Sequence, residues 1–267
     1  RSAYTTSALS YVEDLSKKYP IVVTGANYPL FYQETDAKIN LLDSINALTY
    51  FIKNNIKGVF LVFNGSNKNV TSKIHIGTKV KKDKWEDSCY KSLYIGKESI
   101  GKIHQKKIEF DIGLYKNLFV SQKRYKNLTI KFNHDQTAFL KIHPGLDPNI
   151  LNLLFENGKR YFVLEIYNSG TAPAGDFPLA LDSIIETISI NNGLVFAISQ
   201  HEGGLGVKMN IYASSSVLKN KGLIPLNDMI WEACVPKLML ASANFENNED
   251  IVKYMQTNIA GEIRDGL

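Results

Sequence analysis

Short apolar runs alternate with amphipathic stretches along the chain, and this rhythm predicts strands that alternate with helices. Residues 21–23 and 59–63 are apolar without a polar interruption, as in parallel strands that are covered on both faces. Between them, apolar residues recur at helical spacing from Ile39 to Ile52. We expect this helix to begin at Asp36, whose carboxylate can cap the amides of its first turn. The order of strand, helix and strand is typical of a parallel sheet.

Two further stretches complete the first half of the chain. Residues 3–17 predict an amphipathic helix, and from about residue 80 to 132 a weaker pattern indicates short strands and polar loops. One face of the predicted helix carries Tyr4, Ala8, Tyr11 and Leu15. The expected apolar anchors of the weaker stretch are Ile100, Ile103, Ile108 and Phe110.

The alternation returns at Thr137. Strands are expected over residues 137–142, 161–166 and 194–199. Asp147 and Pro148 fit the N-cap and first position of a helix that stops at Asn157-Gly158. Further helices are expected over residues 179–190 and 228–240.

The sequence therefore predicts an α/β protein with two domains. The first has a parallel, flavodoxin-like sheet and covers residues 1–116. Residues 117–136 form an expected linker, and residues 137–267 form a smaller α/β domain.

Composition narrows the class of protein. The chain has 267 residues, of which 44% are hydrophobic, and no apolar run is long enough to span a membrane. Cys89 and Cys234 lie far apart and indicate no disulfide framework, which suits a reducing compartment. We therefore expect a cytoplasmic protein without a membrane partner.

Charge adds little to this picture. The formal net charge is +5, and lysines cluster at residues 79–84, 102–107 and 123–126. A nucleic-acid surface and solvated lysine-rich loops are both compatible with this pattern. The loops are favoured because the clusters alternate with acids and lack regular aromatic interleaving, so no nucleic-acid partner is expected.

The loop that leaves the first strand carries the candidate chemistry. It reads Thr24-Gly25-Ala26-Asn27, and Pro29 delays the next helix. In an open α/β sheet, the loops at the carboxyl ends of strands form the ligand crevice. Small side chains and free backbone amides at this place make Gly25, Ala26 and Asn27 candidate substrate-binding residues.

The segment TGANYPL, followed by TDAKINLLDSINAL, resembles the bacterial-type L-asparaginase family, closest to its cytoplasmic type I branch. Further segments match motifs of this family in the same order along the chain, and the matches together cover most of it. These segments are Thr71 to His75 (TSKIH), Ile142 to Gly145 (IHPG), Tyr167 to Pro173 (YNSGTAP) and Asn227 to Ala233 (NDMIWEA).

The resemblance implies an amidohydrolase that cleaves L-asparagine to L-aspartate and ammonia through an acyl-threonine, without a cofactor. The family uses a Thr nucleophile, a second Thr with an Asp, and a Lys. Lys73 matches this Lys, and a lysine held away from water can accept a proton more readily. His75 in the same motif is expected to pack in a partly buried place. The match of residues 167–173 to a segment at a subunit interface implies a homodimer or homotetramer.

One part of the family pattern is missing. Thr-Gly-Gly-Thr does not occur in the sequence, and the alignment places Arg1 at the last Thr of the family's His-Gly-Thr-Asp-Thr motif. The resemblance therefore implies that both Thr residues and the Asp precede residue 1, and that the first domain lacks its first strands here. A longer protein, a nicked chain and a pseudoenzyme are the three accounts left open.

Two other functions keep the same fold. One is a glutaminase-type subunit of a tRNA-dependent amidotransferase, for which the lysine-rich region is the only hint. The other is a non-catalytic homologue. A metal site is not expected because the spacing of His143, His201 and Glu202 matches no recognised ligand motif.

Overall fold

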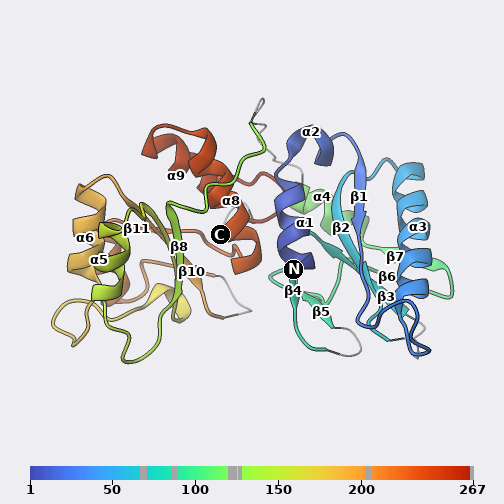
Figure 1. The fold of residues 1–267 in the computed structure, drawn as a ribbon, viewed down its shortest axis with the longest axis horizontal. Coiled ribbons are helices and arrows are strands. Elements are labelled where there is room, and N and C mark those ends of the chain that lie inside the picture. The colour runs from blue at the N-terminus through green and yellow to red at the C-terminus, as the bar shows by residue number, and fades with distance from the viewer. Residues whose placement is uncertain (67–70, 86–88, 120–124, 126–127, 202–205, 265–267) are drawn as a thin grey trace. The chain divides into compact units, whose positions relative to one another are not determined.

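The computed structural model describes residues 1–66, 71–85, 89–119, 125, 128–201 and 206–264. It divides the chain into two compact units (Figure 1). Unit 1 comprises Arg1–Leu128 and Asn258–Glu262, and unit 2 comprises Thr129–Thr257 and Ile263–Leu267.

Unit 1 is built on a mixed sheet with the strand order β1-β2-β3-β6-β7. Strands β1 and β2 run parallel, whereas β3, β6 and β7 extend the sheet antiparallel. A separate antiparallel pair is formed by β4 and β5. The strands are β1 (Pro20–Val23), β2 (Gly58–Phe63), β3 (Thr71–Ile76), β4 (Val80–Lys82), β5 (Tyr90–Ser92), β6 (Gly101–His104) and β7 (Lys107–Phe110).

Helices cover both faces of this sheet, as Figure 1 shows for α1 and α3. Phe51 of α3 packs with Phe60 and Val62 on one face, and Ala3 of α1 packs with Leu61 on the other. The helices of unit 1 are α1 (Ser2–Ser10), α2 (Glu13–Ser16), α3 (Ala37–Lys53) and α4 (Ile112–Phe119).

The single helix expected over residues 3–17 is two helices, α1 and α2, and its expected apolar face is buried only in part. Tyr11 is 1% exposed, as expected, but Tyr4 of α1 and Leu15 of α2 are 38% and 42% exposed. Thr6, Ser7 and Ser10 of α1 are buried instead. These small residues let the helix approach Gly77 closely, where a Cβ atom would lie 2.8 Å from Ser10 Oγ and the Ser7 hydroxyl donates to the carbonyl at 2.8 Å. A tyrosine could not fit such a close approach.

Unit 2 has a fully parallel sheet with the strand order β11-β10-β9-β8. Its core includes Phe162, Leu164 and Val195 from the strands and Ile185 from α6. The strands are β8 (Thr137–Lys141), β9 (Tyr161–Ile166), β10 (Leu194–Ser199) and β11 (Leu223–Pro225). The helices are α5 (Asn149–Glu156), the 3₁₀ turn η1 (Asn168–Gly170), α6 (Asp182–Ile190), α7 (Ala213–Asn220), α8 (Trp231–Asn244) and α9 (Asn248–Gln256).

The predicted α/β class is confirmed in both units. Strands β9 and β10 coincide with the expected ranges, and the expected anchors Ile100 and Ile103 are buried. The parallel rhythm of the first domain holds for β1 and β2, after which hairpin-like pairing takes over. Short elements such as β11 and α7 were not predicted.

Helix α4 reaches into the expected linker of residues 117–136, where Leu118 is buried. Residues 120–124 and 126–127 of that linker, which include all three basic residues of the third lysine cluster, lie outside the described residues. Within the described part of the chain, no helix combines the length and the apolar character that a membrane crossing requires.

Candidate functional site

The predicted site residues of unit 1 lie around the carboxyl ends of β1 and β2. Val23 of β1 is in register with Leu61 of β2, so Gly25 follows β1 level with Phe63. A Cβ atom on Gly25 would lie 3.6 Å from Cε2 of Phe63. Lys73 of β3 is the register partner of Phe63 on its other side. The strand order therefore places Phe63 between Gly25 and Lys73.

Strand pairing also decides which face of the sheet carries Lys73. Residues directly opposite each other in an antiparallel pair project to the same face. Lys73 therefore shares a face with Phe63, which packs with Ala3 of α1. Its neighbour Ser72 projects to the other face, where its hydroxyl donates to Asp43 of α3 at 2.6 Å.

Asp36 holds the loop after β1 instead of capping α3. Its buried carboxylate accepts hydrogen bonds from the backbone N–H of Asn27 at 2.9 Å and of Tyr28 at 3.2 Å. It also accepts from Asn40 Nδ2 at 3.0 Å. Asp36 is the N-cap residue of α3, as expected, but the expected capping bond is wrong, since its side chain accepts no hydrogen bond from the backbone amides of the first turn. A carboxylate turned toward the loop fixes the backbone that follows Gly25.

Asn40 ties together the loops that follow β1 and β2. Its Nδ2 donates to the carbonyl of Gly25 at 2.8 Å, and its Oδ1 accepts from the backbone N–H of Asn64 at 2.7 Å. Asn40 is fully buried. One α3 side chain thus sets the position of both loops at this edge of the sheet. The TDAKIN segment contains this residue, but its sequence pattern does not indicate the bridging role.

The side chain of Asn27 binds other loops. Its Nδ2 donates to the carbonyl of Gly65 at 2.9 Å and to that of Trp85 at 2.7 Å. Its Oδ1 accepts from Lys82 Nζ at 3.2 Å. Asn27 is therefore placed to shape the site, and the backbone of Gly25 and Ala26 is the part of the loop closest to β2.

Lys73 forms an ion pair at this edge. Its Nζ lies 2.5 Å from Oε2 of Glu98, and its side chain is 19% exposed. This hydrogen bond, followed by the charge of Lys73, lowers the pKa of Glu98 below its ordinary value. The ammonium is thus neutralised by a carboxylate that is itself largely exposed and can move away.

His75 is a buried packing residue, more deeply enclosed than expected. It is 1% exposed, and its Nδ1 lies 2.9 Å from the hydroxyl of Ser92 on β5. Burial, and then the charge of Lys73, lowers the pKa of His75 to about 3. The imidazole is therefore neutral near pH 7 and connects β3 to the β4–β5 pair.

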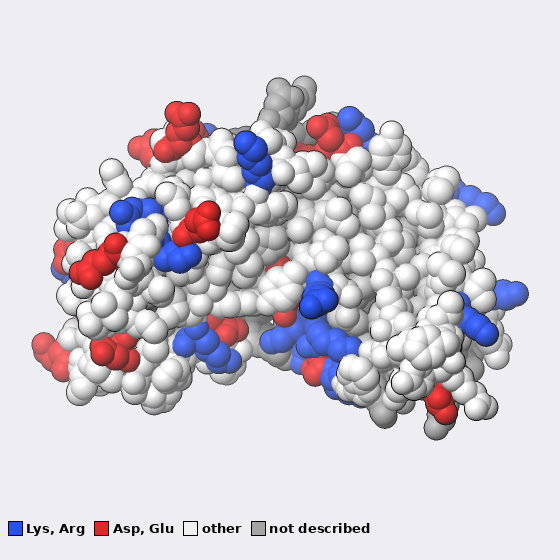
Figure 2. All heavy atoms as spheres, in the orientation of Figure 1, with Lys and Arg blue, Asp and Glu red and all other residues white. Residues whose placement is uncertain are grey.

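Sequence reasoning missed the part that the β4–β5 pair has in this region. Lys82 Nζ lies 4.8 Å from the ring centroid of Tyr90, 5.7 Å from that of Phe63 and 5.9 Å from that of Trp85. On the face in view, Figure 2 shows Lys and Arg side chains gathered over β4 and β5. The aromatic residues at 85 and 90 beside the lysine cluster were the available signal.

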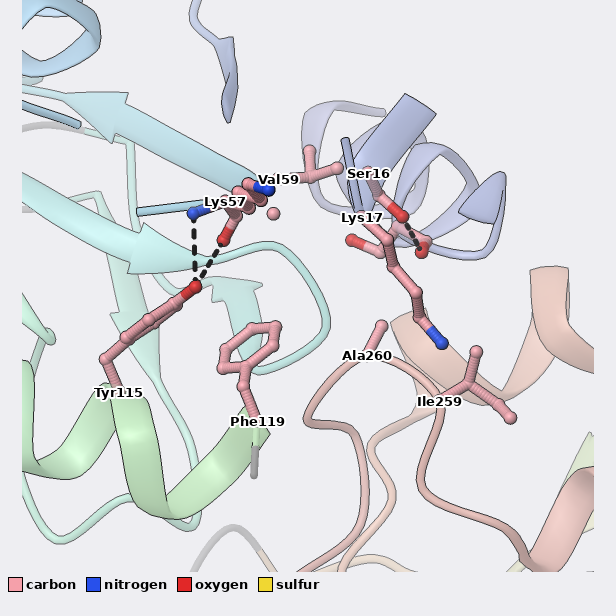
Figure 3. Close-up of a pocket in the computed structure, with 10 residues that line it drawn as sticks. Ser16, Lys17, Lys57, Val59, Tyr115, Phe119, Ile259 and Ala260 are labelled. Carbon is pink, nitrogen blue, oxygen red and sulfur yellow. Dashed lines mark hydrogen bonds between the residues drawn. The ribbon is translucent and has the colours of Figure 1, made fainter. Parts of the chain in front are cut away.

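Two hollows lie away from this edge. One, of about 170 Å³, opens at the amino end of β2 (Figure 3). There the Tyr115 hydroxyl accepts from the N–H of Lys57 and donates to its carbonyl, and Lys17 reaches toward Ile259. The other, of about 320 Å³ and mostly apolar, lies in unit 2 beyond the carboxyl ends of β8 and β9 and includes His143.

Neither hollow holds a cluster of metal ligands. Among the described residues, no group of three or more His, Cys, Asp or Glu side chains could hold a metal ion. Glu202, which the sequence places near His201, lies outside the described residues.

Comparison with known proteins identifies the family. The domain described as "Asparaginase, N-terminal" matches residues 3–112, and the "Glutaminase/Asparaginase C-terminal domain" matches residues 136–255. The fold is similar to a thermostable L-asparaginase from Thermococcus kodakarensis, with a TM-score of 0.76 and 24% identity over 98% of this chain and 73% of that chain. L-asparaginase I from Vibrio cholerae gives a TM-score of 0.74 and 23% identity with the same coverage.

Curated relatives include subunits of glutamyl-tRNA(Gln) amidotransferases. The one from Methanococcus maripaludis is 30% identical over 267 residues, which are 99% of this chain and 60% of the relative. The one from Pyrococcus abyssi is 29% identical over 264 residues, which are 97% of this chain and 56% of the relative. The chain thus spans about 60% of the length of such relatives. With both of its halves matched to the two domains of one family, in their order, the chain belongs to the asparaginase family.

Proposed function

We propose that this chain forms part of an amidohydrolase that converts L-asparagine and water into L-aspartate and ammonia. The observation that carries the proposal is the placement of Lys73 and the Gly25–Asn27 loop on either side of Phe63, in a chain of the asparaginase family. A loop rich in backbone groups and a lysine at one sheet edge suit the binding and proton transfer that amide hydrolysis requires.

In this proposal each residue has a distinct part. Lys73 is the catalytic residue that accepts and returns a proton, which requires that its ammonium leave Glu98 and first give up a proton, so that the neutral amine is the base. The backbone of Gly25 and Ala26 holds the carboxamide of the substrate, and Asn27 keeps that backbone in place. The resemblance implies that a threonine attacks the carboxamide carbon, releases ammonia and is then freed by water. That threonine is not among the matched residues of this sequence.

The proposal is tested by measuring ammonia release from L-asparagine by the full-length protein and by its Lys73→Met variant. Loss of a general acid–base group lowers kcat by about 100-fold or more. Lys102→Met is the matched control, since Lys102 is the register partner of Lys73 on β6 and pairs with the exposed Glu109. The proposal would be contradicted if no ammonia were released from either asparagine or glutamine, or if kcat were unchanged in Lys73→Met.

A second candidate is a glutaminase-type subunit of a tRNA-dependent amidotransferase. The observation that favours it is the set of relatives named as subunits of glutamyl-tRNA(Gln) amidotransferases. The same site would then act on glutamine and deliver ammonia to a partner protein. A higher kcat/KM for glutamine than for asparagine, together with tRNA in the purified protein, would decide for this candidate. A non-catalytic homologue would release ammonia from neither amide.

We also propose that the protein is a cytoplasmic homo-oligomer that uses a small amino acid and no cofactor. Its support is the family resemblance and the two free, buried thiols of Cys89 and Cys234. Light scattering on the eluate of a sizing column measures the oligomer directly. A monomer at all concentrations would contradict this proposal without affecting the first.

A further inference from the structure

The β4–β5 pair reaches the candidate site through Lys82. This residue ends β4, and its ammonium donates to Oδ1 of Asn27 at 3.2 Å, 55 residues away in the sequence. The ring of Tyr90 lies 4.8 Å from the ammonium, and the rings of Phe63 and Trp85 lie within 6 Å. Aromatic faces attract a cation at such distances, so the ammonium is held between rings and an amide oxygen.

Lys82 differs from the other lysines around it. Lys73 pairs with Glu98, Lys91 with Asp83 and Lys102 with Glu109. Within the described part of the chain, no carboxylate lies within ion-pair distance of Lys82. The charge of Lys82 acts on two polar side chains, the Oδ1 of Asn27 and the thiol of Cys89.

The side-chain amide of Asn27 accepts a hydrogen bond from the Lys82 ammonium through its oxygen and donates hydrogen bonds through its nitrogen. Its Nδ2 donates to the backbone carbonyls of Gly65 after β2 and of Trp85 after β4, and more weakly to Sγ of Cys89 at 3.9 Å. A carboxamide can turn over and exchange its oxygen and nitrogen positions. An ammonium beside the oxygen excludes the turned form, because it would then face another donor. Lys82 thus supports, together with the two carbonyls, the orientation in which Asn27 joins its own loop to the two others.

We propose that Lys82 is a positioning residue for the candidate site, which acts through Asn27 on the Gly25–Ala26 backbone. The inference rests on the proposed function, since that backbone is where the carboxamide would bind. Substrate binding would then depend on a residue of the β4–β5 pair, a region that the sequence marks only by lysines and scattered aromatics.

The activity experiment compares Lys82→Met, Lys82→Arg and Lys84→Met in the full-length protein. Lys84→Met is the matched control, because Lys84 follows two residues later in the chain and forms no hydrogen bond with Asn27 among the described residues. Loss of one hydrogen bond to a charged group lowers kcat/KM for the amide by about tenfold. The loss should fall mainly on KM, because the loop binds substrate and Lys73 transfers the proton. Arginine keeps the charge and the cation–π contact and should restore kcat/KM to within about threefold of the wild-type value.

A double-mutant cycle separates positioning from a general loss of stability. In an Asn27→Ser background, Lys82→Met should change kcat/KM by less than about twofold, because coupled residues are non-additive. Equal effects of Lys82→Met with and without Asn27 would overturn the proposal. So would a loss on kcat alone that arginine does not rescue.

Hydrogen exchange keeps the inference testable if the protein releases no ammonia. Lys82→Met should speed exchange of the backbone N–H groups of Asn27 and Tyr28 by about tenfold, whereas Lys82→Arg and Lys84→Met should leave it unchanged. Exchange that is the same in all four proteins would overturn the positioning role. If the wild-type protein releases no ammonia but Lys82→Met still speeds exchange, the result would support the positioning role of Lys82 and contradict the proposed function.

Discussion

Lys73 and Glu98 form an ion pair of 2.5 Å in which the lysine side chain is 19% exposed and the glutamate side chain is 80% exposed. Such an asymmetric pair contributes little to folding, since the exposed partner is well hydrated and screened. The effect of the pair is local, because the Glu98 carboxylate binds the Lys73 ammonium, which the proposed chemistry requires. In the proposed reaction, Glu98 would have to separate from Lys73 before Lys73 takes part in proton transfer.

The first prediction concerns the acidity of Glu98. Lys73→Met removes the hydrogen bond and charge that lower the pKa of this carboxyl, so its pKa should rise toward the ordinary value of 4.5. A depressed carboxyl pKa stabilises the fold above the unfolded pKa and loses this effect as pH falls through the folded pKa. Carboxyl chemical shifts followed by NMR through the acid range measure the change. Lys102→Met should leave Glu98 unaltered, and an unaltered pKa in Lys73→Met would contradict the ion pair.

The second prediction concerns the stability of unit 1 in mild acid. His75 has an ordinary pKa of 6.5 when unfolded and a pKa of about 3 when folded. Between these two pKa values the unfolded state binds a proton at His75 that the folded state does not bind. The free energy of unfolding therefore falls as the pH drops from 6.5 toward 3. Between about pH 7 and about pH 5 this group alone lowers the free energy of unfolding by about 2 kcal/mol.

His75→Asn removes the titrating group and can still bond Ser92 in the place of Nδ1. Urea unfolding at neutral pH and in mild acid should show a smaller acid loss in this variant than in the wild type. His134→Asn is the control, since the His134 side chain is 77% exposed. Equal acid losses in His75→Asn and the wild type would show that His75 is protonated in the folded state.

The third prediction separates the observed role of Asp36 from helix capping. Asp36→Asn places a possible donor where Asn27, Tyr28 and Asn40 all donate, and should cost about 1–3 kcal/mol of local stability. The N–H groups of Asn27 and Tyr28 should exchange faster, and kcat/KM should fall about tenfold. The backbone amides of the first turn of α3 should keep their protection, since none of them donates to this carboxylate.

Asp147→Asn provides the matched comparison in unit 2, because Asp147 Oδ1 accepts from the N–H of Asn149 at 2.9 Å where α5 begins. This variant should loosen the start of α5 and leave kcat/KM unchanged. If Asp36→Asn instead speeds exchange at the start of α3 and leaves the loop protected, Asp36 caps the helix after all.

The fourth prediction concerns a buried ammonium in unit 2. Lys237 is fully buried, and its Nζ donates to the carbonyls of Met255 at 3.1 Å and Thr257 at 2.6 Å, at the end of α9. Lys237→Met leaves these acceptors without their donor and should lower the free energy of unfolding by about 3 kcal/mol. Lys221→Met breaks the partly exposed pair with Glu186 and should cost about 0.5 kcal/mol. Similar values for the two variants in urea unfolding would refute the structural role of Lys237.

Part of the candidate site could be predicted because the family segments mark it. Gly25 and Lys73 belong to separate family motifs, and strand register places both beside Phe63. The sequence also marks Asp36, but predicts a cap, because a carboxylate before a helix has this role most often. Its turn toward Asn27 depends on a loop whose path the local pattern does not specify.

The sequence by itself determined the α/β class, the ranges of β9 and β10 and the family, because apolar periodicity and motif order are local properties of the chain. Only the tertiary structure decided that β3, β6 and β7 run antiparallel and that Lys82 meets Asn27. The reason is physical: strand direction and contacts across 55 residues follow from how loops close and cores pack. The spacing of residues along the chain specifies neither the strand direction nor the contact between Lys82 and Asn27.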